Sequence, residues 1–477
     1  MSGSPLALMA GLVLLAPCAR ADRPTAGTTA FSFESTDVVE HLDDVTGAVR
    51  VHYSVDGPSV TVLDDADSDG LPDFPQLVAS VGADVLDHYS LDMGLRPPVS
   101  EAELGFGRLG GSDAFDFYLV DFGGSSDGQF GVDGCTEVPQ RCSGFMVMEN
   151  DFAGYGYANL EQAVDVLTSH ELFHAVQAAY DGELPVWVSE GTAAWAERTY
   201  DPGSRDFFQF VDAYFDDTGR SIDRPPTGPV PAFAYATALW WDFLTIRHDD
   251  DLIGEYLTAM ERTTPAPQDA LLTLSAVLEA RGDALEEAWS TFARWNLATG
   301  RRAGLAESYP YAGDVGVVRA TAQGPFIDEE HRFYPLAASY FHVDHTGGPL
   351  WFGLDEGAPH LWFAVFRVAD GAVDGPVQAP VAVWEGTDAG AFALADGADL
   401  PAGGYWMVGS YSAIADSSVR VRVCLGDETA ASACVPPPDT GEDTGTDAPG
   451  CGCASGGTRS GSALLGLIAL LGLRRRR

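Results

Sequence analysis

The sequence predicts an α+β protein in which a mixed N-terminal part is followed by an all-β part. Between residues 158 and 299, apolar residues recur at helical spacing, and short alternating segments precede them. From about residue 311 the pattern changes to alternating strands separated by Gly/Asp turns, which is typical of a β-sandwich. We therefore expect an α+β domain over 22–310 and a β-sandwich domain over 311–430.

Composition limits the classes of partner. The 477 residues hold 26 basic and 70 acidic side chains, a formal net charge of −44, and every basic residue is arginine. Because phosphate contact needs clustered cations, we expect no nucleic-acid partner, and membrane contact only through the terminal segments. The absence of lysine also excludes P-loop and Schiff-base chemistry.

The N-terminus predicts export. Residues 1–21 have an apolar centre and end in Ala19-Arg20-Ala21, which is typical of a signal peptide cleaved before Asp22. The alternative is lipidation at Cys18, although Pro17 departs from the lipoprotein pattern. We expect a secreted or surface-displayed protein.

The C-terminus is predicted to lie outside the folded body. Residues 431–455 form an acidic Pro/Thr/Gly linker with a Cys-Gly-Cys, and 456–477 hold a short hydrophobic segment with four terminal arginines. About the last 27 residues resemble the C-terminal sorting tags of myxobacterial surface proteins. The resemblance implies processing near Cys451 and Cys453, with display or release; the alternative is a plain tail anchor.

Four cysteines predict two local disulfides. Cys135 and Cys142 flank one short loop, and Cys424 and Cys434 bracket another. An exported protein meets an oxidising compartment, so both pairs are expected to be bonded.

An aspartate-rich loop is a candidate calcium site. Oxygen ligands recur around Gly70 at the positions that suit Ca²⁺, namely Asp65, Asp67, Asp69 and Asp73. The twelfth position is Gln76, so the loop is no complete EF-hand; it resembles the short calcium loops of extracellular proteins. The alternative is a solvated acidic turn.

The elements of the N-terminal part follow from periodicity. Alternation predicts strands within 31–63 (VRVHYSV and VTVL), at 113–122 and at 144–150. Helical spacing predicts helices over 75–94, 158–182, 184–200, 250–262, 268–281 and 283–299, and one within 231–244.

The chemistry is predicted to lie on two neighbouring helices. His170-Glu171-Leu172-Phe173-His174 is an H-E-x-x-H stretch, which places two imidazoles on one helix face, where they can hold zinc. Glu171 is then placed to act as general base toward a zinc-bound water.

The following helix supplies the rest of the predicted site. A catalytic zinc needs a third protein ligand, and Glu190 can provide it from the neighbouring helix. Glu197, seven residues on, faces the same side and can orient a ligand histidine by a hydrogen bond. The alternatives are a solvated helix face, or Glu197 as the ligand instead.

These residues carry a family resemblance. H-E-x-x-H followed by W-x-x-E-G-x-x-A resembles the gluzincin metallopeptidases. With YSV, DSDGLPDF, MENDF, HELFHAVQ and SEGTAAWAE, residues 50–300 resemble a family of secreted myxobacterial metalloproteases. The resemblance implies a zincin-like fold, with a twisted sheet above the H-E-x-x-H helix, and a zinc site. The chain departs in its short His174–Glu190 gap and in Ser189, where aminopeptidases have asparagine.

Two further roles are implied by the resemblance. Tyr235 opens a helix whose equivalent in gluzincin aminopeptidases carries a tyrosine that donates to the developing oxyanion; the alternative is an aromatic core residue. GFMVMEN faintly resembles their substrate strand, where Glu149 would hold a free amino terminus.

The sequence thus predicts a secreted or surface-displayed zinc metallopeptidase acting on a peptide or protein. Zn²⁺ is the expected cofactor, with Ca²⁺ as a candidate second ion. The rival functions are a calcium-braced surface adhesin on a zincin scaffold, and a zinc hydrolase of another class.

Overall fold

The computed structural model describes residues 23–26, 31–203, 206–224, 232–385, 388–415 and 417–435. The predicted signal peptide with Cys18, the linker beyond residue 435 with its Cys-Gly-Cys, and the segment 456–477 lie outside the described residues. Within the described part, no helix is long and apolar enough to cross a membrane. Both helices and sheets are present, so the predicted α+β class is confirmed.

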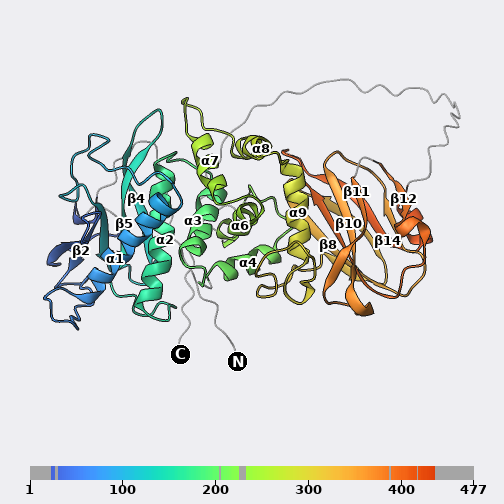
Figure 1. Cartoon of the computed structure of the whole chain (residues 1–477), viewed down its shortest axis with the longest axis horizontal. Coiled ribbons are helices and arrows are strands. Elements are labelled where there is room, and N and C mark those ends of the chain that lie inside the picture. The colour runs from blue at the N-terminus through green and yellow to red at the C-terminus, as the bar shows by residue number, and fades with distance from the viewer. Residues whose placement is uncertain are drawn as a thin grey trace, which may run out of the picture. The chain divides into compact units, whose positions relative to one another are not determined.

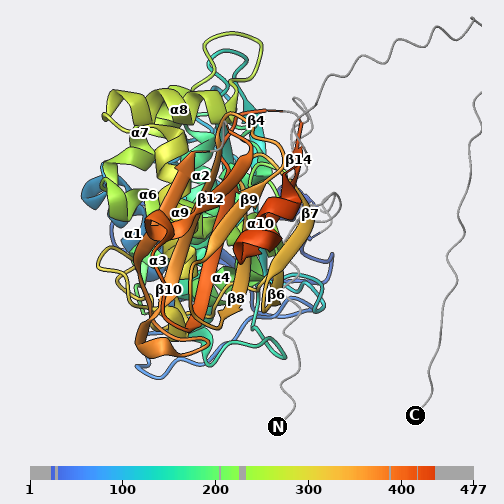
Figure 2. The ribbon, with the colours of Figure 1, turned by 90° about the vertical axis from the view of Figure 1, so that its right-hand side faces the viewer.

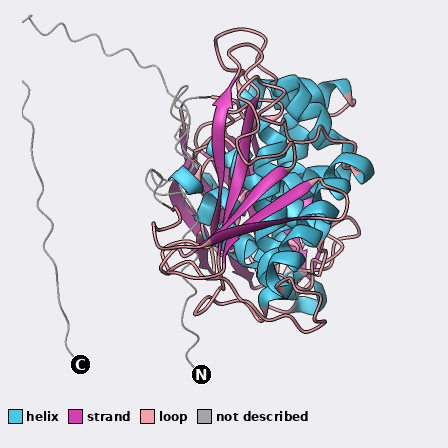
Figure 3. Ribbon diagram, turned by 90° about the vertical axis from the view of Figure 1, so that its left-hand side faces the viewer, coloured by secondary structure: helices cyan, strands magenta, loops and turns pink. Residues whose placement is uncertain are grey.

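The first sheet has five strands in the order β1-β2-β3-β5-β4 (Figures 1 and 3). The neighbours β2/β3 and β3/β5 are parallel, while the two edge pairs are antiparallel. VTVL forms no strand, since only Val60 makes a bridge, to Ser54. The strands are β1 (Val39–Asp43), β2 (Val49–Ser54), β3 (Phe115–Val120), β4 (Gly128–Cys135) and β5 (Cys142–Glu149).

Two helices cover one face of this sheet. Helices α1 (Asp73–Asp87) and α2 (Leu160–Ala178) pack on it through a shared apolar core, and a π-helical turn (His88–Asp92) follows α1. Because side chains alternate along a strand, Phe117 faces this core while Tyr118 faces the opposite side. The sheet therefore has an inner face against α2 and an outer face.

The outer face is covered by the N-terminal segment. Phe33 packs there with Tyr118 and Phe145, and the Arg23 side chain lies only 5% exposed beside the buried carboxylates of Asp116 and Asp133. The N-terminal segment therefore contributes the arginine of a buried charge cluster on the outer face of the sheet.

Helices make up the middle of the chain (Figure 1). Large aromatic side chains fill their core, including Trp195, Trp240, Trp241 and Trp289. Helix α4 is not among the helices predicted from the sequence. The helices are α3 (Val186–Tyr200), α4 (Asp206–Asp216), α5 (Ala232–Ala236), α6 (Ala238–Arg247), α7 (Asp251–Met260), α8 (Ala270–Ala280) and α9 (Leu285–Leu297).

The C-terminal part is sandwich-like, with sheets in the orders β11-β10-β13-β8-β6 and β12-β9-β14-β7 (Figure 2). On β10, Phe363 and Val365 face the sandwich core, while Trp362 and Phe366 join the helical core. The central strands of the sheet that contains β10, namely β8, β10 and β13, are thus buried on both faces. The elements are β6 (Ala322–Gly324), β7 (Ile327–Phe333), β8 (Ala337–His345), β9 (Trp351–Leu354), β10 (Leu361–Val368), β11 (Val377–Glu385), β12 (Gly390–Ala393), β13 (Gly403–Tyr411), β14 (Val419–Gly426) and α10 (Glu428–Cys434).

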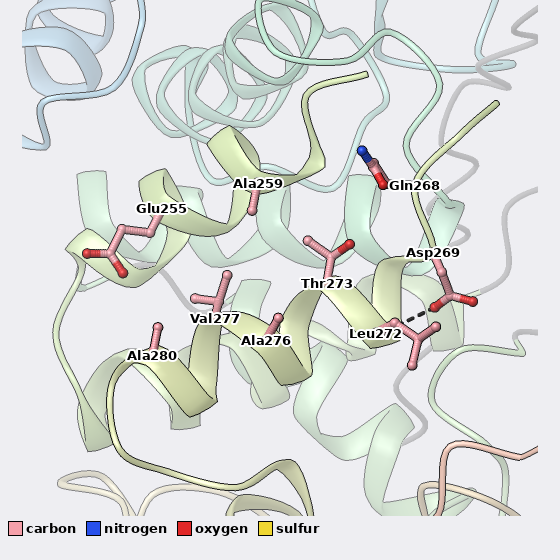
Figure 4. A pocket seen from close by; sticks show the side chains of 9 residues that line it. All are labelled: Glu255, Ala259, Gln268, Asp269, Leu272, Thr273, Ala276, Val277 and Ala280. Atoms are coloured by element: carbon pink, nitrogen blue, oxygen red, sulfur yellow. Dashed lines mark hydrogen bonds between the residues drawn. The ribbon is translucent and has the colours of Figure 1, made fainter. Parts of the chain in front are cut away.

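A groove lies between α7 and α8 (Figure 4). Its two carboxylates are engaged: Asp269 accepts a hydrogen bond from the Leu272 amide at 2.9 Å and caps α8, and Glu255 pairs with Arg281 at 2.8 Å. The residues that line it include no histidine or cysteine. The groove therefore offers no zinc-type ligand set.

Candidate metal centre

Helix α2 brings the H-E-x-x-H side chains into the interior. Asn159 caps the helix by accepting a hydrogen bond from the Gln162 amide at 2.8 Å. The helix is buried from Thr168 onward, and the rings of His170 and His174 lie 4.9 Å apart between centroids. The two imidazoles therefore share one face, as their spacing predicts.

Helix α3 packs against α2 and brings Glu190 to both rings. The Glu190 Oε2 atom lies 3.3 Å from His170 Nε2 and 3.6 Å from His174 Nε2. Gly191 allows a close approach of the next helices, because a Cβ there would lie 2.1 Å from Thr237 Oγ1. The glycine after Glu190 thus serves packing.

The outer nitrogen of each imidazole is held by an acceptor. His170 Nδ1 lies 2.6 Å from Glu197 Oε1, and His174 Nδ1 lies 2.8 Å from Gln177 Oε1. When Nδ1–H donates in both rings, each Nε2 lone pair is free to bind an ion held between the rings and Glu190. Glu197 is placed where the sequence analysis put it.

Gln177 was not predicted from the sequence. Its own amide is fixed, because Nε2 donates to Thr192 Oγ1 at 2.7 Å and to the Ser189 carbonyl at 2.8 Å. Its position three residues after His174, on the same helix face, is the signal that could have identified it. Ser189 also lies close, with Oγ 3.3 Å from His174 Nδ1.

This donor set fits zinc. Two imidazole nitrogens and one carboxylate oxygen, from His170, His174 and Glu190, all lie within 4.8 Å of one another. Two histidines with a glutamate form a known set for catalytic zinc, which leaves further positions open.

Buried charge dominates the electrostatics. Burial lowers the pKa of His170, but hydrogen bonds with Glu190 and Glu197 outweigh it and raise that pKa well above the ordinary 6.5. Burial would raise the pKa of Glu190, yet His174 and His170 bring it far below the usual 4.5. The pKa of Glu197 is raised to about 7 by burial, against the hydrogen bond from His170. Glu190 is thus an ionised acceptor at neutral pH.

Glu171 and Tyr235 border the same site. Burial raises the pKa of Glu171, partly offset by the charges of His174 and His170. The Tyr235 ring lies 5.5 Å from His170 and stacks on Phe210 at 5.2 Å between centroids. Burial and the charge of Glu190 raise the pKa of Tyr235 well above 10. Its phenol therefore keeps its proton at neutral pH.

The aspartate-rich loop brings together three of its four predicted ligands. Oxygens of Asp65, Asp67 and Asp73 lie within 4.8 Å of one another. Asp69 is not in this group, and its carboxylate accepts from the Leu71 amide and from Gln76 Nε2, both at 2.8 Å. The three grouped carboxylates also accept hydrogen bonds from backbone amides of the loop.

Glu149 is fixed by contacts of its own. Its Oε2 accepts hydrogen bonds from the Phe122 amide at 2.9 Å and from the Tyr155 hydroxyl at 3.1 Å. Burial raises its pKa to about 7.

Both predicted disulfides, Cys135–Cys142 and Cys424–Cys434, are present.

Comparison with known proteins adds little. No protein-family model matches the chain, and no curated protein matches it. Among solved structures, PliG of Aeromonas hydrophila, a periplasmic inhibitor of g-type lysozyme, matches 23% of this chain and 96% of that chain. The identity is 14% and the TM-score 0.16. So low a score carries no argument for this chain.

Proposed function

We propose that the protein is a secreted or surface-displayed zinc metallopeptidase of the gluzincin type, with a zincin-like catalytic part. One observation carries the proposal: two buried imidazoles and the Glu190 carboxylate converge, while Glu197 and Gln177 hold the outer nitrogens. A sheet packed on the H-E-x-x-H helix, with α3 beside it, supports the zincin-like assignment.

Each residue of the site is proposed to have its own role. His170, His174 and Glu190 would hold zinc, which when bound supplies Lewis-acid activation of water and of the scissile carbonyl. Glu171 takes a proton from the attacking water and passes it to the leaving amine.

Tyr235 is proposed to donate its phenolic proton to the oxygen that gains charge during attack. A donor fixed before the reaction, in a site of low dielectric constant, stabilises that charge without reorganising. Stacking on Phe210 holds the ring, and its high pKa keeps the proton available.

Export and calcium binding belong to the same proposal. The two disulfides agree with an oxidising compartment. The oxygens of Asp65, Asp67 and Asp73 are near enough to share one Ca²⁺, which would brace the loop before α1.

The test compares matched variants of the purified, zinc-loaded chain on casein and on fluorogenic peptides. Glu171→Gln should keep its zinc and lose activity by about 10²–10⁴-fold. Glu190→Ala should lose both zinc and activity. The control is Glu161→Gln, an exposed acid in the first turn of the same helix, which should cleave as the wild type does. A wild type without zinc would refute the proposal, as would a Glu171→Gln variant of full activity.

A further inference from the structure

A cavity lies where the helical part of the chain meets the sandwich sheet that contains β8 and β13. Its free space is about 590 Å³, and small-molecule sites measure about 300–1,000 Å³. It is bounded by the end of α4, the 3-10 turn Gly300–Arg302, the segment around β6, and strands β8 and β13. No residue of the proposed zinc site lines it.

One buried cation of this cavity has too little counter-charge. Arg302 is 3% exposed, and its Nε donates to Asp374 Oδ1 at 2.9 Å. Asp374 also accepts from Arg301 Nε at 2.6 Å, so a single carboxylate serves two guanidiniums. Burial lowers the pKa of Arg302, and the hydrogen bond with Asp374 offsets only part of this effect. A further anion beside the two arginines would therefore stabilise the buried charge.

Arg23 shows the opposite case. It is buried to a similar degree, but it lies beside several carboxylates, including those of Asp116 and Asp133. Burial lowers its pKa, yet the hydrogen bond with Asp133 and the surrounding charges outweigh this and raise the pKa above its ordinary value. The chain thus compensates the charge of Arg23 fully and that of Arg302 only in part.

Hydrogen-bond donors at the cavity are also left over. Arg302 Nη1 donates to the Val318 carbonyl at 2.9 Å, whereas Nη2 makes no hydrogen bond within the described part of the chain. The guanidinium lies 3.7 Å over the ring of Trp406, whose buried indole N–H has no partner among the described residues. Because buried polar groups are normally paired, these donors favour an acceptor supplied from outside the chain.

The other polar groups of the lining suit hydroxyls. Arg319 and Asp216 form an exposed ion pair at 2.9 Å, and the exposed Asp344 carboxylate lies 3.8 Å from His342 Nδ1. Gln323 is exposed on β6, the last strand of its sheet. Hydroxyls can donate to these carboxylates and accept from the guanidinium and the amide. A run of acidic peptide side chains, by contrast, would be repelled by Asp216 and Asp344.

We propose that this cavity binds an acidic saccharide. One sugar unit places its carboxylate or sulfate against Arg301 and Arg302, and its hydroxyls contact the exposed ion pair, Asp344 and Gln323. A guanidinium binds either kind of oxyanion through two parallel hydrogen bonds. The inference does not rest on the peptidase function, and it adds a binding activity for acidic polysaccharides at the sandwich.

Calorimetric titration of the zinc-loaded full chain tests the ligand class. Tetragalacturonate and a sulfated galactose tetramer are compared with neutral galactotetraose. At least one acidic probe should bind about tenfold more tightly than the neutral one, as expected for a hydrogen bond to a charged group. The tighter of the two identifies the anion. Failure of both acidic probes to bind, or equal binding of the neutral one, would overturn the proposal. Tetraglutamate bound as tightly as the better acidic sugar would overturn the saccharide class.

Matched variants then test the place of binding. Arg301→Gln should weaken binding of the better probe by about tenfold. Arg420→Gln is the control, because both arginines pair with a carboxylate and have side chains that are 61% exposed, but Arg420 does not line the cavity. Arg302→Lys keeps the buried charge but lacks the planar fork, and should also weaken binding. Unchanged affinity in Arg301→Gln, or an equal loss in Arg420→Gln, would overturn the proposal.

Discussion

The two faces of the N-terminal sheet bury their charges in different ways. On the outer face, Arg23 lies among the carboxylates of Glu101, Asp116 and Asp133, so the chain itself supplies the cation. On the inner face, the Glu190 carboxylate lies between two imidazoles, 3.3 Å from His170 Nε2 and 3.6 Å from His174 Nε2. The outer cluster is paired within the chain and serves the fold, whereas the inner one brings together a donor set that fits zinc.

Most of the hydrogen-bonding capacity of the Arg23 guanidinium is used within the outer cluster. Arg23 binds Asp133 through two hydrogen bonds, at 2.9 and 2.7 Å, and also contacts Asp116 and the Tyr118 hydroxyl. Its guanidinium lies over the Phe145 ring at 5.3 Å. This is a bidentate pair, which the planar guanidinium of arginine forms with a carboxylate.

The largest expected effect is therefore on the outer face. Arg23→Ala leaves buried acids without their cation and should lower the free energy of unfolding by about 3–5 kcal/mol. Urea unfolding followed by circular dichroism measures it. Zinc content of the folded fraction should not change; a stability equal to that of the wild type would show that Arg23 is not the counter-ion.

Another buried carboxylate, Glu149, gives a pH test. Its pKa is raised to about 7 from 4.5, so the folded state binds the proton more tightly than the unfolded state. Stability from this group is present at low pH and is lost as the pH rises from about 4.5 to 7, by roughly 3 kcal/mol at most. In Glu149→Gln this part of the pH dependence should disappear. Parallel curves of unfolding free energy against pH for the two proteins would contradict it.

A smaller effect is expected at the residues that hold the imidazoles. Gln177→Ala and Glu197→Gln keep all three proposed ligands but release His174 or His170, and should weaken zinc binding by about 10–100-fold. Competition with a chromophoric chelator measures the affinity. Unchanged affinity in both variants would mean that these contacts do not orient the ligands.

The smallest effect is expected at the exposed loop. Calcium should raise the melting temperature by a few degrees, in line with a contribution of about 1 kcal/mol. In Asp67→Asn the rise should shrink. Asp64→Asn, next to the loop, serves as the control, and an equal response in both variants would argue against the site.

Local patterns predicted much of this structure. Periodicity located α2, α3 and α7–α9, and spacing identified both disulfide pairs, because each depends on residues close in sequence. The Arg23 cluster could not be predicted, since it joins residues 23, 101, 116 and 133 through tertiary packing.

The central claim is that the inner cluster takes its cation from outside, as a zinc ion on His170, His174 and Glu190. X-ray absorption at the zinc edge tests it most directly. The account predicts one zinc per chain, with two imidazole nitrogens at about 2.0–2.1 Å and oxygen ligands besides. In Glu190→Gln the zinc should bind at least tenfold more weakly. A wild type that binds no zinc, or a zinc without imidazole ligands, would contradict the account.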